Sequence, residues 1–163
     1  AVDNNTEDVT GASAGQERGI IDSNIYNDGT GASVLTGGRR FSDSCSTDIF
    51  IHMDGQEVFK FAVKSVPTAI ETLLHNNNMN VDDVDKFILH QANVRIIESV
   101  AKRLKADKDK FPVNLNEYGN TSSASIPILL DELNRNGSLK QGEKLILAGF
   151  GAGLSWGSIL LVW

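Results

Sequence analysis

The sequence is poor in cysteine, in proline and in long apolar runs, and each shortage bears on the class of protein. It holds one cysteine, Cys45, which cannot form a disulfide within the chain and fits a reducing, cytoplasmic compartment. No segment reaches the roughly 18 consecutive apolar residues of a membrane span, and the polar, acidic N-terminal segment is not typical of a signal peptide. The whole sequence has 15 basic and 21 acidic residues, and this net negative charge argues against nucleic acid as the main partner.

What is present is an ordinary globular composition, 40% hydrophobic and 22% charged, in a length that suits one domain with a real core. Strand-like and helix-like patterns alternate along the chain, which predicts an α/β fold with a partly parallel sheet. The predicted strands are residues 19–26, 33–35, 87–89, 144–150 and 156–163, and the predicted helices are residues 57–75, 94–104 and 124–135.

Prolines and asparagines punctuate the helical patterns. Pro67 interrupts the first predicted helix and should kink it or mark a junction. The run of asparagines at residues 76–78 predicts the end of that helix, and Asn93 is placed to cap the next one. Pro127 is compatible with the third helix only if it lies in the first turn.

Three segments at element boundaries could carry chemistry. His90 directly follows an apolar strand, Asn120 lies in a turn that leads into a helix, and residues 149–153 form a glycine-rich turn after another strand. In open α/β sheets, ligands bind beyond the carboxyl ends of the strands. An imidazole N–H and an amide N–H that face one carbonyl oxygen would stabilise negative charge on it, each by roughly 3 kcal/mol.

Structural interpretations of the same residues stay open at this point. A histidine after a strand is often a hydrogen-bonded structural residue, and Asn120 beside Gly119 fits an ordinary turn or cap. Residues 151–153 could simply be a hairpin between two strands. Cys45 has no helix, base or glycine turn nearby to activate it as a nucleophile. The histidines share no spacing typical of metal ligands, so no metal site is expected.

Taken together, three motifs change this balance. The segments HQANVRII, YGNTSSASIPILLDE and GFGAGLSWGSILL, with MDGQEVFKFAV before them, resemble the C-terminal half of β-ketoacyl-acyl-carrier-protein synthase III. The similarity runs from roughly Gly19 to Trp163, and the order and spacing of the motifs make it specific. It implies half of a thiolase-like fold, a mixed five-stranded sheet with helices packed on its faces.

The resemblance also implies residue roles in decarboxylative condensation. His90 and Asn120 would donate hydrogen bonds to the malonyl thioester carbonyl and stabilise the enolate left by loss of CO₂. That carbon then attacks an acyl group held on a cysteine. Phe150 matches the phenylalanine near the decarboxylating carboxylate, and the backbone amide of Ala152, beside Gly151, would complete the acyl oxyanion hole. Beside the pantetheine tunnel, Asn93 is the matching residue.

The substrates and partners that the resemblance implies are malonyl and acyl-CoA thioesters and acyl carrier protein, with no cofactor, and the full enzyme is expected to be a homodimer. Arg95 matches an arginine of the basic patch that receives the acidic carrier protein, with Lys60, Lys102 and Arg103 as neighbours. Cations at the C-terminal end of a helix also complement its dipole, so a solvated helix end is the alternative.

The family's nucleophilic cysteine belongs to the N-terminal half and has no match here. We therefore expect residues 1–18 to continue from such a half and residues 19–163 to form the C-terminal domain, inactive alone and with an exposed apolar face. The predicted function is the C-terminal catalytic half of a synthase III, an acyltransferase of fatty-acid biosynthesis. The alternatives are a non-catalytic thiolase-fold subunit or carrier-protein-binding module, and a related condensing enzyme of secondary metabolism.

Overall fold

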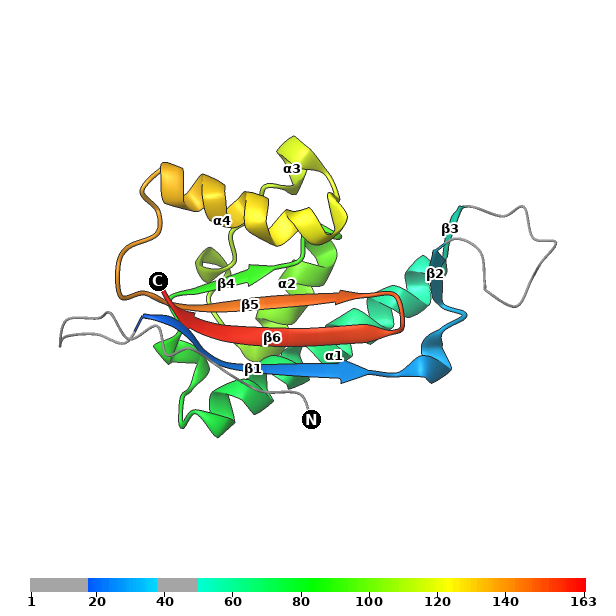
Figure 1. Ribbon diagram of the computed structural model, residues 1–163, viewed down its shortest axis with the longest axis horizontal. Helices are drawn as coiled ribbons and strands as arrows, with labels where there is room; N and C mark the ends of the chain where they lie inside the picture. Colours follow the sequence, from blue (N-terminus) through cyan, green and yellow to red (C-terminus); the bar gives the residue numbers. More distant parts are fainter. Residues whose placement is uncertain (1–17, 38–49) are drawn as a thin grey trace, which may run out of the picture.

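A mixed, four-stranded sheet forms the centre of the molecule. The computed structural model describes residues 18–37 and 50–163 (Figure 1). The strand order is β1-β6-β5-β4, and β4 and β5 are parallel whereas the other neighbours are antiparallel. The strands are β1 (Gly19–Asn27), β4 (Lys86–Leu89), β5 (Lys144–Gly151) and β6 (Ser155–Val162). The predicted α/β class and the mixed sheet are confirmed.

The predicted strand count of five differs from the structure. Among the described residues, the sheet has four strands, because the strand expected at residues 33–35 is part of a separate antiparallel ribbon. This ribbon pairs β2 (Leu35–Gly37) with β3 (Ile51–Met53). The surrounding stretch is rich in glycine and serine, which favour turns over strands, and only three residues on each side pair.

Helices lie around the sheet in an arrangement that follows their apolar faces. Helix α1 packs against β6, β5 and β1, and α2 packs on α1, whereas α4 lies beside β4 (Figure 1). The helices are α1 (Gly55–Asn76), α2 (Val94–Leu104), α3 (Leu115–Tyr118) and α4 (Ser125–Arg135), with 3₁₀ turns η1 (Gly29–Gly31), η2 (Val81–Asp83), η3 (Lys108–Lys110) and η4 (Ser122–Ala124). No helix in the described part of the chain is long and apolar enough to cross a bilayer.

Helix α1 begins directly after its capping residue, Asp54, and does not break at its proline. The Oδ1 atom of Asp54 accepts hydrogen bonds from the backbone N–H groups of Gln56 and Glu57, at 3.0 Å each. The predicted junction at Pro67 is wrong, because the helix continues through it to Asn76. Pro67 is buried with the apolar face of α1, so packing compensates for the backbone hydrogen bond that proline cannot donate.

The ends of α2 and α4 agree with the sequence patterns. The Oδ1 atom of Asn93 accepts a hydrogen bond of 2.9 Å from the backbone N–H of Arg95 and so caps α2. Pro127 lies in the first turn of α4, where its missing N–H costs no intrahelical bond. Gly137, with φ of 74°, takes a left-handed conformation just after α4 ends.

Strand β1 is held to the rest of the molecule through Asn24. Its Nδ2 donates to the carbonyl of Ala69 on α1 at 2.8 Å, and its Oδ1 accepts from the backbone and hydroxyl of Ser158 on β6. Since side chains alternate along a strand, Ile25 must point to the face of the sheet opposite α1. An irregularity between Ile20 and Asp22 shifts the register, so Ile20, opposite Leu161, lies on the same face as Ile25, opposite Gly157. Ile25 is 77% exposed and Ile20 is 70% exposed, so that face of β1 is apolar and open.

The close approach of β1 to β6 predicts a strong effect of replacing Gly157 by alanine. A Cβ atom at Gly157 would lie 2.5 Å from the backbone oxygen of Asn24, which cannot move without shifting β1. We expect Gly157→Ala to lower the free energy of unfolding by about 1–3 kcal/mol, measured by urea denaturation. The control is Gly55→Ala, because a Cβ there meets nothing within 4 Å and alanine favours the helix. Equal stability of the two variants would contradict this packing.

Candidate active site

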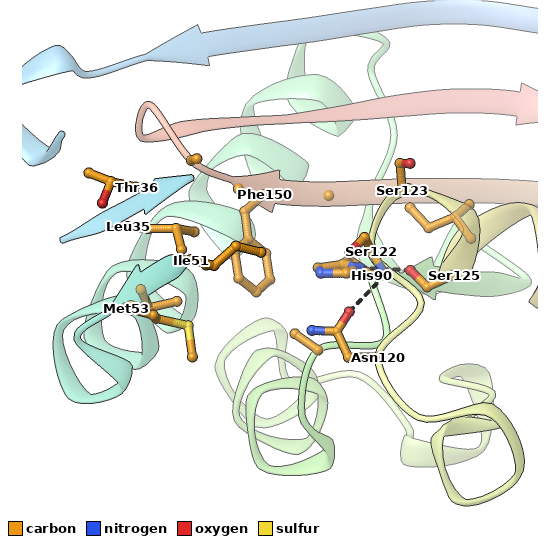
Figure 2. A pocket seen from close by; sticks show the side chains of 16 residues that line it. Leu35, Thr36, Ile51, Met53, His90, Asn120, Ser122, Ser123, Ser125 and Phe150 are labelled. Atoms are coloured by element: carbon orange, nitrogen blue, oxygen red, sulfur yellow. Dashed lines mark hydrogen bonds between the residues drawn. The ribbon is translucent and has the colours of Figure 1, made fainter. Parts of the chain in front are cut away.

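A cavity of about 520 Å³ lies at the edge of the sheet where parallel strands β4 and β5 both end. His90 follows β4, and its backbone N–H continues the ladder by bonding to the carbonyl of Ala148 at 2.9 Å. Phe150 and Gly151 come from the end of β5. The wall also includes Asn120 and Ala152 from two loops, and apolar side chains of β2, β3, α1, α4 and the loop before α2 (Figure 2): Leu35, Ile51, Met53, Val58, Ile126 and Ala92.

His90 is held by one hydroxyl and one aromatic ring. Its Nδ1 lies 2.7 Å from the hydroxyl oxygen of Ser125, at the start of α4. Its ring meets Phe150 edge to face, with centroids 5.3 Å apart. Figure 2 shows the other end of the imidazole turned away from Ser125, toward the cavity. Burial lowers the pKa of His90 below its ordinary value of 6.5, so the ring is neutral at pH 7.

The lowered pKa of His90 predicts a measurable pH dependence. Because the folded chain disfavours the protonated ring, the unfolded chain binds the proton first as the pH falls below 6.5. The contribution of His90 to stability is therefore complete above pH 6.5 and is lost as the pH falls through the folded-state pKa. An NMR titration of the His90 ring should show a midpoint below 6.5. A midpoint above that value would contradict the burial of the ring.

The side chain of Asn120 faces the same cavity from the loop between α3 and α4. Gly119, with φ of 66° and ψ of −161°, takes a backbone conformation reserved for glycine and turns the chain toward η4. The Oδ1 atom of Asn120 accepts a hydrogen bond of 2.9 Å from the backbone N–H of Ser122. This bond identifies the oxygen, so the amide N–H₂ is the end turned into the cavity (Figure 2). The amide N–H₂ of Asn120 and one end of the neutral His90 ring thus border the same, largely apolar space.

Behind His90 lies a buried polar network that the sequence analysis missed. Gln91 is 1% exposed, and its side-chain amide donates to the carbonyl of Leu89 at 2.8 Å and accepts from the backbone N–H of Asn114 at 3.3 Å. Asn114 in turn donates to Glu132 on α4 at 2.8 Å. These bonds fix the His90 loop to α4. No local pattern in the sequence predicts contacts between segments so far apart in the chain.

Other predicted site residues lie outside the cavity. Asn93 is exposed and is used as the cap of α2, and the cavity wall at that point is Ala92. Arg95 lies in the first turn of α2, and its guanidinium has no ion pair with any residue in the described ranges. Lys102 and Arg103 are exposed in its last turn. On α1, Lys60 forms an ion pair of 2.7 Å with Glu57, which raises the pKa of Lys60.

Two further predictions concern Cys45 and the absence of a metal site. Cys45 lies outside the described residues. Within residues 18–37 and 50–163, no group of three or more His, Cys, Asp and Glu side chains could hold a metal ion.

Comparison with known proteins decides the family. Residues 74–163 match the family model described as 3-oxoacyl-[acyl-carrier-protein (ACP)] synthase III C terminal. The chain belongs to the synthase III family. The resemblance of its three motifs to this family is thereby confirmed.

Individual synthase III proteins agree over nearly the whole chain. The β-ketoacyl-[acyl-carrier-protein] synthase III of Clostridium acetobutylicum is 44% identical, over 91% of this chain and 48% of that protein. The crystal structure of 3-oxoacyl-[acyl-carrier-protein] synthase III from Aquifex aeolicus matches with a TM-score of 0.83 and 36% identity, over 93% of this chain and 46% of that one. The priming β-ketosynthase from the R1128 polyketide biosynthetic pathway matches with a TM-score of 0.78 and 35% identity, over 88% of this chain and 45% of that one.

These matches confirm the thiolase-like fold of the synthase III family. They also show how much of a whole synthase III this chain represents. The chain spans about half the length of the curated relatives it matches. His90, Asn120 and the turn after β5 come from the three motifs that carry the resemblance, and the structure brings all three to one cavity.

Proposed function

We propose that the chain is the C-terminal catalytic half, residues 19–163, of a synthase III that condenses malonyl-acyl-carrier protein with an acyl-CoA primer in fatty-acid biosynthesis. The observation that carries this proposal is the meeting of His90 and Asn120 on one cavity at the carboxyl edge of the sheet, in a chain of this family. A purely structural subunit would need neither donor, and this favours an enzyme over the non-catalytic alternative.

The reaction begins with loss of CO₂ from the malonyl group. The bond between its carboxylate and the α-carbon breaks, and the electron pair moves toward the thioester carbonyl to give an enolate. The neutral imidazole of His90 and the amide of Asn120 donate hydrogen bonds to the enolate oxygen and lower the barrier. The α-carbon then attacks the primer thioester on a cysteine of the other half, a carbon–carbon bond forms, and the cysteine leaves as thiolate. No cofactor takes part in these steps.

Phe150 and the turn after it serve the other charges of the reaction. Phe150 lies against the His90 ring and lines the cavity, so its ring can face the malonyl carboxylate. An apolar neighbour disfavours the charged carboxylate relative to neutral CO₂. The backbone N–H of Ala152, beside Gly151, donates to the oxygen of the primer carbonyl as the enolate attacks. Asn93 contributes at the pantetheine entrance rather than inside the cavity.

The open face of β1 fits the surface that an N-terminal half would cover. Ile20 and Ile25 are largely exposed on the side of the sheet that α1 does not cover, and the chain spans about half the length of its relatives. Exposed apolar patches of this kind mark interfaces. In this proposal residues 1–18 join the two halves, which then form a cytoplasmic homodimer.

An activity assay of the assembled enzyme tests the proposed function. The chain, joined or mixed with its N-terminal half, is supplied with malonyl-acyl-carrier protein and an acyl-CoA, and CO₂ and the 3-oxoacyl product are measured. Release of both in equal amounts is expected. No CO₂ release with any primer would favour the non-catalytic subunit.

Secondary metabolism remains the second candidate because the polyketide priming synthase is also a structural match. The two functions share the same chemistry and differ in the primer. A series of acyl-CoA primers of increasing length and branching distinguishes them in the same assay. Preference for a short primer such as acetyl-CoA favours fatty-acid initiation, whereas exclusive use of longer primers favours a polyketide role.

The exposed charge of Arg95 predicts a difference between substrates carried on acyl carrier protein and substrates carried on free CoA. Arg95 is exposed in the first turn of α2, three residues after Ala92 of the cavity wall, and its guanidinium forms no ion pair with a residue of the described ranges. Lys102 and Arg103 lie along the same helix, and Lys60 lies on α1. We expect Arg95→Glu to raise the KM for malonyl-acyl-carrier protein about tenfold, because it reverses a charge that attracts an acidic partner. The KM for malonyl-CoA should stay unchanged.

The matched control for this experiment is Arg135→Glu. Arg135 is also an exposed arginine, but it lies at the far end of α4, where it pairs with Asp131 at 2.8 Å. Its replacement should leave both KM values unchanged. Equal effects of the two substitutions would show that overall charge, rather than a docking site on α2, governs the interaction.

A further inference from the structure

Ser125 is the polar side chain that contacts the buried end of His90. It is 2% exposed, and its hydroxyl oxygen lies 2.7 Å from Nδ1 of His90. The same oxygen accepts a hydrogen bond of 3.2 Å from the backbone N–H of Gln91. Among the described residues, the Ser125 hydroxyl has no other hydrogen-bond partner.

Counting hydrogens at Ser125 decides the direction of its bond to His90. A hydroxyl has one hydrogen to donate and two lone pairs to accept with. The N–H of Gln91 can only donate, so it occupies one lone pair. The remaining acceptor within reach of the hydroxyl hydrogen is Nδ1 of His90. If Nδ1 carried a proton instead, both neighbours would donate to the same oxygen, and a buried hydroxyl hydrogen would have no acceptor.

We propose that Ser125 is a positioning residue that holds neutral His90 in the tautomer with its proton on Nε2. This leaves an N–H donor, rather than a lone pair, on the side of the ring that faces the cavity. An unsatisfied buried hydroxyl disfavours the opposite tautomer by about tenfold or more. The consequence for catalysis rests on the proposed function, because the Nε2 proton matters only if His90 donates to the enolate oxygen.

The fold accounts for why a serine can act here. Ser125 is the first residue of α4, so its side chain points back toward the loop before the helix rather than along it. The network from Gln91 through Asn114 to Glu132 holds the start of the His90 loop against α4. Ser123 lines the same cavity two residues earlier, is exposed and makes no hydrogen bond to His90, so it provides a matched control.

The test is the ¹⁵N NMR spectrum of the histidine rings in the labelled chain above pH 7, which reports the proton position on each ring. We expect His90 to show the Nε2–H form in at least about tenfold excess. Ser125→Ala should lower that ratio about tenfold, whereas Ser125→Thr, which keeps a hydroxyl, and Ser123→Ala should not. A native ring protonated on Nδ1, or an unchanged ratio in Ser125→Ala, would overturn the proposal, and the first of these results needs no variant.

Activity of the assembled enzyme separates this proposal from the proposed function. Ser125→Ala should lower kcat for malonyl decarboxylation about twofold at unchanged KM, because a tautomer ratio that falls from about ten to about one roughly halves the Nε2–H population. Ser125→Thr should restore it. A shifted tautomer with full activity would support the role of Ser125 and contradict the use of His90 as a donor. A full rate together with an unshifted tautomer would overturn the role of Ser125.

Discussion

Replacing His90 by alanine in the assembled enzyme is expected to slow malonyl decarboxylation about 100- to 1,000-fold, the usual effect of removing one donor to a developing oxyanion. The structure gives the reason, because His90 is a neutral ring held by Ser125 and Phe150 with its other end toward the cavity. The measurement is the rate of CO₂ release from malonyl-acyl-carrier protein. Transfer of the primer to the cysteine of the other half should continue.

The controls for His90→Ala use the second donor and a residue of the same cavity. Asn120→Ala should cause a loss of similar size. The double variant should lose less than the product of the two single losses, because both side chains serve one oxygen. Thr36→Val changes a residue of the cavity wall without removing either donor and should retain most of the activity. Full decarboxylation by His90→Ala would end the assignment of His90.

The largest expected effect on stability comes from Phe87, at the centre of the core. Phe87 is 0% exposed on β4 and stacks on Phe111, with ring centroids 4.7 Å apart and an interplanar angle of 6°. Phe87→Ala should lower the free energy of unfolding by about 3–5 kcal/mol, since the cavity left by the ring cannot close against a strand paired with β5. Urea denaturation monitored by circular dichroism measures the change.

Tyr118→Ala is the matched control, an aromatic-to-alanine change at a residue that is 51% exposed. Its cost should be below about 1 kcal/mol. A domain of this size has a total stability of about 5–15 kcal/mol, so Phe87→Ala should approach the limit of folding. Similar losses in the two variants would contradict the position of Phe87 in the core.

The elements could be predicted from the sequence where their signals are local. The apolar period that forms α1, the cap at Asn93 and the strand that ends before His90 all depend on residues close together in the chain. Of the two outcomes expected at Pro67, a kink or a junction, the junction is wrong because the burial of α1 against the sheet, a tertiary effect, outweighs the local preference of proline. The strand at residues 33–35 was likewise expected in the sheet, whereas β2 pairs only with β3 among the described residues.

The site was predictable in part for the same reason. His90, Asn120 and the glycine-rich turn stand at element boundaries within specific motifs, and parallel strands bring such boundaries to one edge. Ser125 and Gln91 act through bonds between the start of α4 and the loop after β4, and a serine or glutamine in the sequence gives no sign of such a partner. Asn93 caps α2 as its position in the sequence indicates, and its place beside the pantetheine tunnel stays a prediction.

The joint action of the two donors is tested most directly by a crystal structure of the assembled enzyme with a non-hydrolysable malonyl thioester analogue bound. The expected result is that the carbonyl oxygen of the analogue lies about 2.7–3.1 Å from both His90 Nε2 and Asn120 Nδ2, with Phe150 beside the carboxylate. An oxygen that contacts only one of these nitrogens, or that points away from β4 and β5, would contradict the mechanism.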